Sequence, residues 1–145
     1  MNVDDLALAL NVGSARGARA LARAVRGEKR RVAALGEAVA RALEQEGHEA
    51  LRARLERGRL PLDDSAADAL CASGLPDLSL APQLIKECAR VVRDGGSIIV
   101  ATAAGIVGRG PERHVLTAMF MHAGLVEVAQ QMSRGTALTS GRVRR

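Results

Sequence analysis

Short apolar runs alternate with amphipathic segments along the chain. Residues 6–12, 31–35, 67–72 and 97–103 are apolar or β-branched runs of the length and kind found in buried strands. Between and after them, apolar residues recur at helical spacing in four segments, 15–26, 37–46, 81–93 and 111–123. Strands that alternate with helices predict parallel β-α-β units, and hence an α/β protein with helices on both faces of one sheet.

Two further regions complete this pattern. The segment ALRARLE at residues 50–56 is ambiguous, because Leu51 and Leu55 have helical spacing while its alternate residues are apolar as in a strand. Its residue types favour a helix. The closing runs 126–132 and 136–143 are separated only by a short turn, which predicts an antiparallel hairpin at one edge of the sheet.

Length and composition indicate one domain, residues 1–145. The chain has 48% apolar residues, enough for a core of ordinary size, but contains no Trp or Tyr and a single Phe, Phe120. The core must therefore be almost entirely aliphatic. No secretory signal and no run of about eighteen apolar residues is visible, so we expect a soluble, cytoplasmic protein that does not bind membranes.

The chain is basic, with a formal charge of +5 and a pI of about 10.5. A basic protein invites a nucleic-acid function, but aromatic side chains that could stack on bases are missing. Nucleic acid is therefore the least favoured of the partners considered. Cys71 and Cys88 lie among apolar residues, which predicts buried, reduced thiols. We expect the three histidines at the surface or on helices, because they lack the spacing of metal ligands.

Three stretches of the second half share the pattern of a known family. They are LPLDDSAADALCASGL (60–75), LIKECARVVRDGGSIIVATA (84–103) and HAGLVEVAQQ (122–131). In order and spacing they resemble the segments LPxxDxxxDxVxxxxxL, ExxRVLxPGGxLxxx and AGFxxV of the class I S-adenosylmethionine-dependent methyltransferases. The resemblance implies a doubly wound, Rossmann-like sheet of seven strands, mostly parallel, with an antiparallel last strand. It also implies that 50–56 is a strand, because pairing with neighbouring strands outweighs local propensity.

The family's cofactor loop, DxGxGxG, corresponds here to NVGSARG at residues 11–17. Asn11 replaces the acid and Ala15 the central glycine, and a side chain where glycine adopts a positive φ costs on the order of 1 kcal/mol or redirects the loop. The ribose-binding acid is missing at Leu35 or Gly36. If the chain retains a cofactor site, the resemblance implies that Gly13, Gly17, Glu37 and Glu56 bind S-adenosylmethionine there.

Simpler interpretations exist for both acids. Glu37 would stabilise the start of a helix, and Glu56 lies on an arginine-rich, solvated segment. No catalytic or metal-binding residue stands out, and we expect no lid over the site. The favoured hypothesis is a degenerate, non-catalytic domain that binds or regulates another protein or a second copy of itself. The alternatives are a small active methyltransferase with a relaxed cofactor site and, less favoured, a nucleic-acid-binding protein.

A possible contact surface follows from one helix. Met119, Phe120 and Met121 are consecutive large apolar residues, and a helix that packs through one stripe cannot bury all three. We therefore expect at least one of them to be exposed and to contribute to an interface.

Overall fold

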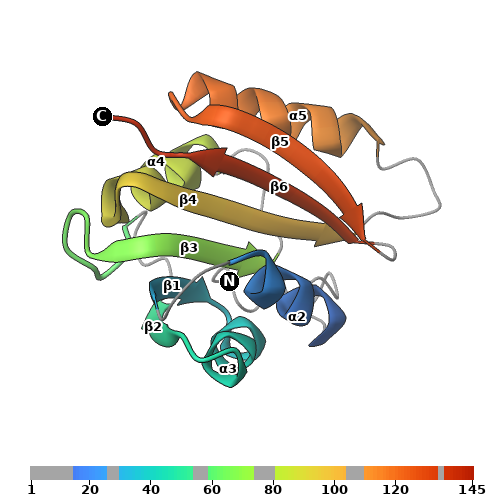
Figure 1. Ribbon diagram of the computed structural model, residues 1–145. Coiled ribbons are helices and arrows are strands. Elements are labelled where there is room, and N and C mark those ends of the chain that lie inside the picture. The colour runs from blue at the N-terminus through green and yellow to red at the C-terminus, as the bar shows by residue number, and fades with distance from the viewer. Residues whose placement is uncertain (1–14, 26–29, 54–58, 74–80, 104–109, 134–135) are drawn as a thin grey trace.

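The computed structural model describes residues 15–25, 30–53, 59–73, 81–103, 110–133 and 136–145 (Figure 1). Its helices are α2 (Ala15–Ala24), α3 (Glu37–Gln45), α4 (Ala81–Val91) and α5 (Gly110–His122). Its strands are β1 (Arg31–Leu35), β2 (Glu49–Ala53), β3 (Ala67–Ser73), β4 (Val92–Ala103), β5 (Val126–Ser133) and β6 (Thr136–Arg142). The predicted strand at 6–12 lies outside the described residues.

The described strands form one sheet in the order β2-β1-β3-β4-β6-β5. Strands β2, β1, β3 and β4 are parallel, whereas β6 is antiparallel to both β4 and β5. This confirms the α/β class and the antiparallel last strand. It also confirms a strand in the ambiguous segment, over 49–53, because β2 gains five parallel partners on β1 that outweigh its helical propensity.

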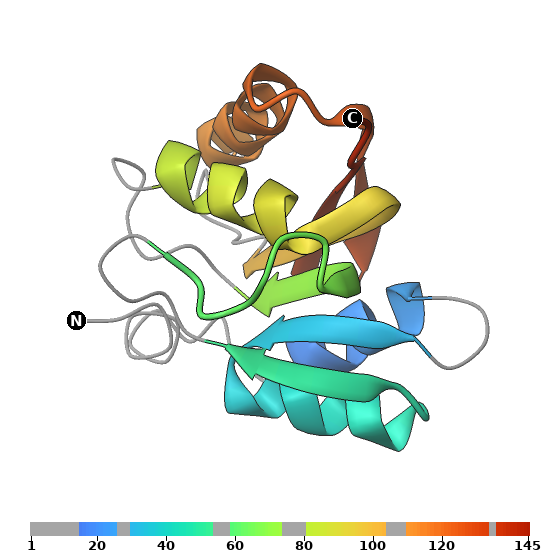
Figure 2. The same cartoon turned by 90° about the vertical axis from the view of Figure 1, so that its left-hand side faces the viewer.

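Helices cover both faces of the sheet, as the alternating pattern predicts. α2 and α3 pack together on one face, and α4 and α5 lie on the other (Figure 2). Burial from both sides explains why four of the five residues of β1 are buried and apolar. Among the described helices, none is both long and apolar enough to cross a membrane.

The core is aliphatic on both faces, with Phe120 fully buried among Leu, Ile and Val side chains. Cys71 and Cys88 are buried and unpaired, which confirms the prediction of reduced thiols. Burial raises the pKa of each thiol to about 12, because the interior disfavours the thiolate.

The expectation that His48 lies at the surface or on a helix is wrong. His48 is 7% exposed and joins two elements: its Nδ1 accepts the backbone N–H of Arg30 at 3.2 Å, and its Nε2 lies 3.2 Å from the carbonyl of Val25. Since Nδ1 accepts, Nε2 carries the proton and donates it to Val25. A buried imidazole therefore fastens the end of α2 to the start of β1.

Gly95 and Gly96 lie in a bulge inside β4, ahead of the apolar run 97–103. Ala67 pairs with Val92 and Ala69 with Ser97, so several residues of β4 lie opposite one residue of β3. Gly95 adopts a φ of 83°, and a Cβ on Gly96 would collide with the carbonyl oxygen of Asp68. Both glycines are required here, and β4 consequently begins earlier than the apolar run suggests.

Candidate functional site

The strand order places a candidate site between β1 and β3. The chain proceeds outward from β1 to β2 and then returns to β3 on the other side of β1. Doubly wound sheets bind ligands beyond the carboxyl ends of their strands at such a point of reversal. The described residues at this position are Leu35 at the end of β1, Gly36 and Glu37 after it, and Ala72 near the end of β3.

β1 and β3 are direct neighbours in the sheet. They pair in parallel from Val32 opposite Ala69 to Leu35 opposite Ala72. In a doubly wound sheet with the order 3-2-1-4, the first strand separates the second from the fourth. Here the two strands that correspond to the second and fourth are hydrogen-bonded to each other.

Asp68 fastens this pairing at the amino ends of the strands. Its carboxylate accepts the backbone N–H of Arg31 at 3.0 Å and the Nε–H of Arg93 at 2.9 Å. The pKa of Asp68 is lowered, chiefly by the Arg31 N–H and then by the Arg93 guanidinium. One ionised side chain thus links β3 to both of its neighbours, β1 and β4.

Glu37 is the first residue of α3 and the acid nearest to the candidate site. Gly36, with a φ of 122°, turns the chain out of β1, and no side chain caps the helix. A carboxylate at this position also stabilises the positive end of the helix dipole. The sequence-level interpretation of Glu37 as a helix-start residue is therefore consistent with its place in the fold.

Arg52 binds the carboxylate of Glu37 from the neighbouring strand β2. Arg52 donates from Nε to Glu37 Oε2 at 2.9 Å and from Nη2 to Glu37 Oε1 at 3.1 Å. The same guanidinium donates to both oxygens of Glu44, two turns along α3, at 2.9 and 3.0 Å. Arg41 adds a further contact to Glu37 at 3.3 Å. We call this group the Arg52 cluster.

The Arg52 cluster holds its charges in the ionised state. Hydrogen bonds from Arg52 lower the pKa of both Glu37 and Glu44, and the two carboxylates raise the pKa of Arg52. The cluster is nevertheless open to solvent, since between 46% and 73% of each side chain is exposed. Water screens such pairs, so their effect on stability is small.

Glu37 already has partners where the resemblance would place the ribose of S-adenosylmethionine. Both oxygens of Glu37 accept from Arg52, although a ribose-binding acid must receive two hydroxyl groups. Among the side chains that the structure describes, Glu37 is the acid that follows β1 directly, and the nearby Leu35, Ala53 and Ala72 are buried and apolar. The described part of the site offers no second acceptor.

The structure brings few of the sequence-predicted site residues together. Gly13 and Glu56 lie outside the described residues, as does the first part of the cofactor loop, residues 11–14. Gly17 is the third residue of helix α2, so it follows the start of a helix. Arg52, which sequence reasoning left in a solvated segment, is the residue that decides the environment of Glu37. The signal that could have identified Arg52 is the register of the sheet, which pairs Arg52 of β2 with Ala34 of β1, three residues before Glu37.

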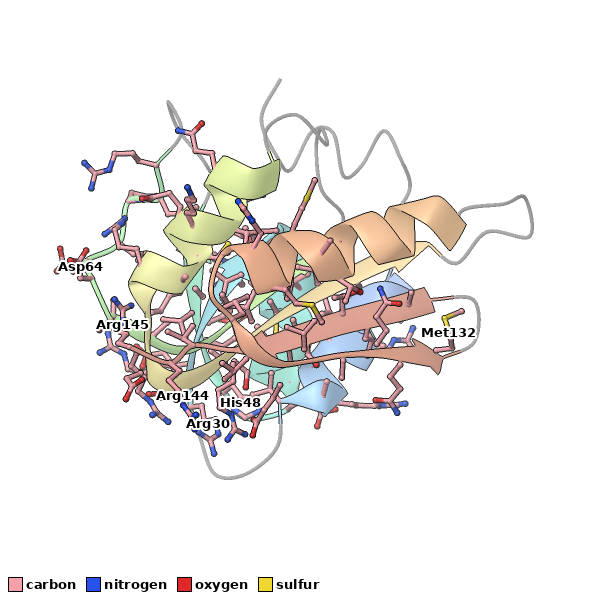
Figure 3. All side chains as sticks on the ribbon, turned by 90° about the horizontal axis from the view of Figure 1, so that it is seen from above. Arg30, His48, Asp64, Met132, Arg144 and Arg145 are labelled. Atoms are coloured by element: carbon pink, nitrogen blue, oxygen red, sulfur yellow. The ribbon has the colours of Figure 1, made fainter. Side chains whose placement is uncertain are left out.

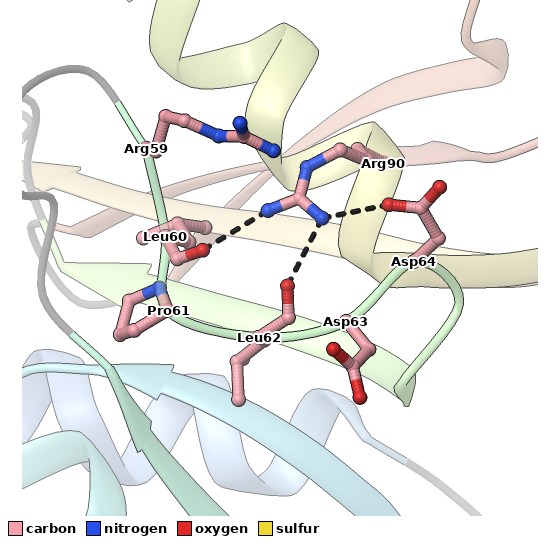
Figure 4. A pocket seen from close by; sticks show the side chains of 7 residues that line it. All are labelled: Arg59, Leu60, Pro61, Leu62, Asp63, Asp64 and Arg90. Carbon is pink, nitrogen blue, oxygen red and sulfur yellow. Dashed lines mark hydrogen bonds and ion pairs between the residues drawn. The ribbon is translucent and has the colours of Figure 1, made fainter.

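A hollow lies beside the loop 59–64, which leads into the amino end of β3 (Figure 4). It has a volume of about 600 Å³ and is lined by the loop 59–64 and by Arg90 of α4. Because ligands of doubly wound sheets bind at carboxyl ends, this position does not correspond to a cofactor site. Its chemistry instead explains part of the family-like sequence.

Arg90 uses its guanidinium to fasten the loop to α4. It donates to the carbonyls of Leu60 and Leu62 and to Asp64, and it forms a two-pronged ion pair with Glu87 at 2.9 Å. Glu87 also accepts the backbone N–H of Leu60 at 2.8 Å. We call this group the Arg90 cluster. The motif ExxR, present as Glu87 and Arg90, is thus structural.

The helix with three consecutive large apolar residues behaves as predicted in one respect. Phe120 is fully buried, Met119 packs partly buried against the core, and Met121 is 59% exposed. One of the three therefore reaches the surface. Among the described residues, no three His, Cys, Asp or Glu side chains gather as metal ligands would.

Comparison with known families gives a match over most of the chain. Residues 8–100 match the family described as "Methyltransferase domain", which covers more than half of the chain and includes the segment 11–17. No curated protein matches the sequence.

Solved structures of low sequence identity share the fold. A methyltransferase of Thermotoga maritima, dependent on S-adenosylmethionine, has a TM-score of 0.57 and 16% identity, over 94% of this chain and 92% of that one. The Burkholderia thailandensis 1,6-didemethyltoxoflavin-N1-methyltransferase, solved with S-adenosylhomocysteine, has a TM-score of 0.64 and 14% identity, over 95% and 81%. A chain from a Haloferax volcanii complex of a methyltransferase with its activator has a TM-score of 0.59 and 16% identity, over 98% and 93%.

Proposed function

The chain belongs to the family of class I S-adenosylmethionine-dependent methyltransferases, and we propose that it is a non-catalytic member that binds or regulates another protein. One observation carries the proposal: the acid nearest the candidate site, Glu37, is occupied by Arg52 and Arg41. A cofactor ribose would have to compete with these guanidinium groups for that carboxylate. The direct pairing of β1 with β3 and the apolar strand ends around Leu35 support the same conclusion.

A protein partner agrees with two features. Met121 exposes a large, adaptable apolar side chain on α5, whereas Phe120 and Met119 are taken up by the core. One structure with the same fold comes from a complex that contains a methyltransferase activator, and this supports a protein interface for the present chain. We propose that Met121 contributes to the contact, made with another protein or with a second copy of this chain.

The first test is cofactor binding. We expect no thermal shift and no calorimetric heat with S-adenosylmethionine or S-adenosylhomocysteine at millimolar concentration, because a ligand bound only to the native state must raise its melting temperature. The variant Ala15→Gly restores the family's central glycine, and Arg52→Met releases Glu37. If the site is lost as a whole, neither substitution alone produces saturable binding. Micromolar affinity of the unmodified chain would contradict the proposal.

The second test is association. Light scattering at several concentrations and capture from a native extract are compared for the unmodified chain and Met121→Glu. We expect a partner or a dimer that Met121→Glu weakens, while Met132→Glu, a change at the other strongly exposed methionine, leaves it intact. A strict monomer that captures nothing, or equal effects of both variants, would contradict an interface at α5.

The alternative function is an active methyltransferase with a relaxed site. It is favoured by the family match, which begins at residue 8 and includes the loop that carries Gly13 and Gly17. In that case Glu37 and Glu56 would complete the cofactor contacts, and Arg52→Met should tighten binding by freeing Glu37. The calorimetric titration separates the two functions, because only this alternative requires saturable binding of the cofactor.

A further inference from the structure

Arginines gather along the amino ends of the strands, opposite to the candidate site. We call this surface the arginine edge; it comprises Arg19, Arg23, Arg30, Arg31, Arg93, Arg144 and Arg145. Figure 3 shows three of them, Arg30, Arg144 and Arg145, on the same side of the molecule. His48 contacts both Val25, just after α2, and Arg30, just before β1, which places the last turn of α2, with Arg23, near the start of β1.

Direct contacts make the arginine edge continuous. His48 joins Val25, at the end of α2, to Arg30. Asp68 then joins Arg31 to Arg93, through the backbone N–H of the first and the guanidinium of the second. Asp94, the residue after Arg93, accepts the backbone N–H of Arg145 at 2.8 Å. The surface therefore extends from α2 across β1, β3 and β4 to the end of the chain.

The arginine edge carries an excess of positive charge. Seven arginines are accompanied by the acids Glu46, Glu49, Asp68 and Asp94, and the exposed Asp63 and Asp64 lie in the loop that precedes β3. Arg19, Arg23 and Arg144 are exposed and form no ion pair with any residue that the structure describes. Helix α2 contains no acidic residue, and the small Ala20 and Ala24 flank its exposed arginines. A bulky anionic surface can thus approach closely.

From this arrangement we infer that the arginine edge binds the phosphate backbone of duplex nucleic acid. Guanidinium groups recognise phosphate through paired hydrogen bonds, and several of them along one surface suit a repeating anion. Base stacking is not available, because the chain has no Trp or Tyr and its single Phe, Phe120, is fully buried. Backbone contact with a duplex is therefore favoured over recognition of a single strand.

An acidic protein is the less favoured occupant. Protein interfaces are centred on desolvated apolar or aromatic side chains. Among the side chains that the structure describes, the exposed large apolar ones are Met121 and Met132. They belong to α5 and β5, which contribute no arginine to this edge, and Met132 lies on the other side of the molecule (Figure 3). The inference is also independent of the proposed function, because this surface does not include the candidate cofactor site.

The test is fluorescence anisotropy of labelled duplex DNA and duplex RNA, each about two helical turns long and of mixed sequence, with the complete chain. We expect binding at about 50 mM salt that weakens steeply by about 200 mM, with a slope that reports on the order of three phosphate contacts. The two duplexes differ in groove shape, so comparing them shows which form the surface prefers. Single-stranded DNA of the same length should bind more weakly than either.

A charge-matched pair of variants locates the surface. Arg19→Ala/Arg23→Ala should weaken duplex binding about tenfold at low salt and reduce the salt slope by about two. Arg41→Ala/Arg59→Ala removes the same charge elsewhere and should change affinity by less than about twofold. Melting temperatures of all variants verify that they fold. Equal losses in both double variants, no duplex binding at low salt, tighter binding of the single strand, or stronger binding of poly-glutamate than of either duplex would each overturn the inference.

Discussion

Arg52 and Arg90 each join two acidic side chains, but the two clusters differ in burial and in what they connect. The Arg52 cluster lies on the solvent side of β2 and α3, where Arg52 is 46% exposed and bonds only to carboxylates. In the Arg90 cluster, Arg90 is 20% and Glu87 14% exposed, and backbone groups of Leu60 and Leu62 are bound as well. Arg90 thus organises a loop, whereas Arg52 only neutralises neighbouring charges.

This difference explains where the chain retains the pattern of its family. The segments around residues 60–64 and 84–96 resemble the family closely because they form a clamp and a bulge that the sheet needs for its own stability. The sheet does not need the ion pairs around Glu37 for its stability, since these pairs are exposed to solvent. Retained motifs in the second half therefore report the fold and say nothing about the cofactor.

The largest expected effect is the loss of the Arg90 clamp. Arg90→Ala leaves the largely buried Glu87 carboxylate without its cation and the carbonyls of Leu60 and Leu62 without donors. We expect a loss of about 2–4 kcal/mol in the free energy of unfolding, measured by urea denaturation. Arg90→Lys keeps the charge but not the planar fork, so an intermediate loss should result. A loss for Arg90→Ala no larger than that for Arg52→Ala would remove the distinction between the clusters.

A moderate effect is expected from acid. Arg90 lowers the pKa of Glu87 below its ordinary value of 4.5, so the stability it contributes is present above that value and is lost as the pH falls through the lowered pKa. The pKa of Glu37 is also lowered, chiefly by the hydrogen bond from Arg52, so its contribution to stability is lost in the same direction of pH. Between about pH 5 and pH 3, Glu87→Gln should flatten the fall in melting temperature more than Glu37→Gln does. The reverse order would show that the exposed cluster is the stronger one.

The smallest effect should come from salt on the Arg52 cluster. Arg52→Ala is expected to lower the urea midpoint only slightly at low ionic strength, since the pairs are exposed. At about 1 M NaCl, where charges are screened within about 3 Å, the difference from the unmodified chain should vanish. The difference between Arg90→Ala and the unmodified chain should persist, because its hydrogen bonds to carbonyls are shielded from solvent. Equal sensitivity of the two variants to salt would contradict this.

Most of the fold follows from local patterns. Apolar runs and helical spacing predicted β1 with its observed bounds, placed β3, α3 and α5 within about one or two residues, and predicted the closing hairpin of β5 and β6. These features are readable because strands and helices impose periods of two and 3.6 residues on their own sequences. The segment 50–56, which contains most of β2, fitted both the helical and the strand period, and only the family resemblance identified it as a strand.

The candidate site was less predictable. Glu37 was placed correctly at the start of a helix, but its partner Arg52 was not foreseen, and His48 was expected in the wrong environment. Gly13 and Glu56 stay predictions. Contacts such as that of Glu37 with Arg52 depend on which strands are neighbours and in which register they pair.

The sequence by itself determined the class of fold, the aliphatic core and the helices and strands, because each of these arises from residue types and spacing within one segment. The tertiary structure decided that β1 pairs with β3, that Arg52 takes the carboxylate of Glu37, and that Arg90 clamps the loop before β3. Each of those contacts joins residues far apart in the chain. They follow from the register of the sheet and the packing of helices on it, since a shift of one residue in a strand would turn every one of its side chains to the other face.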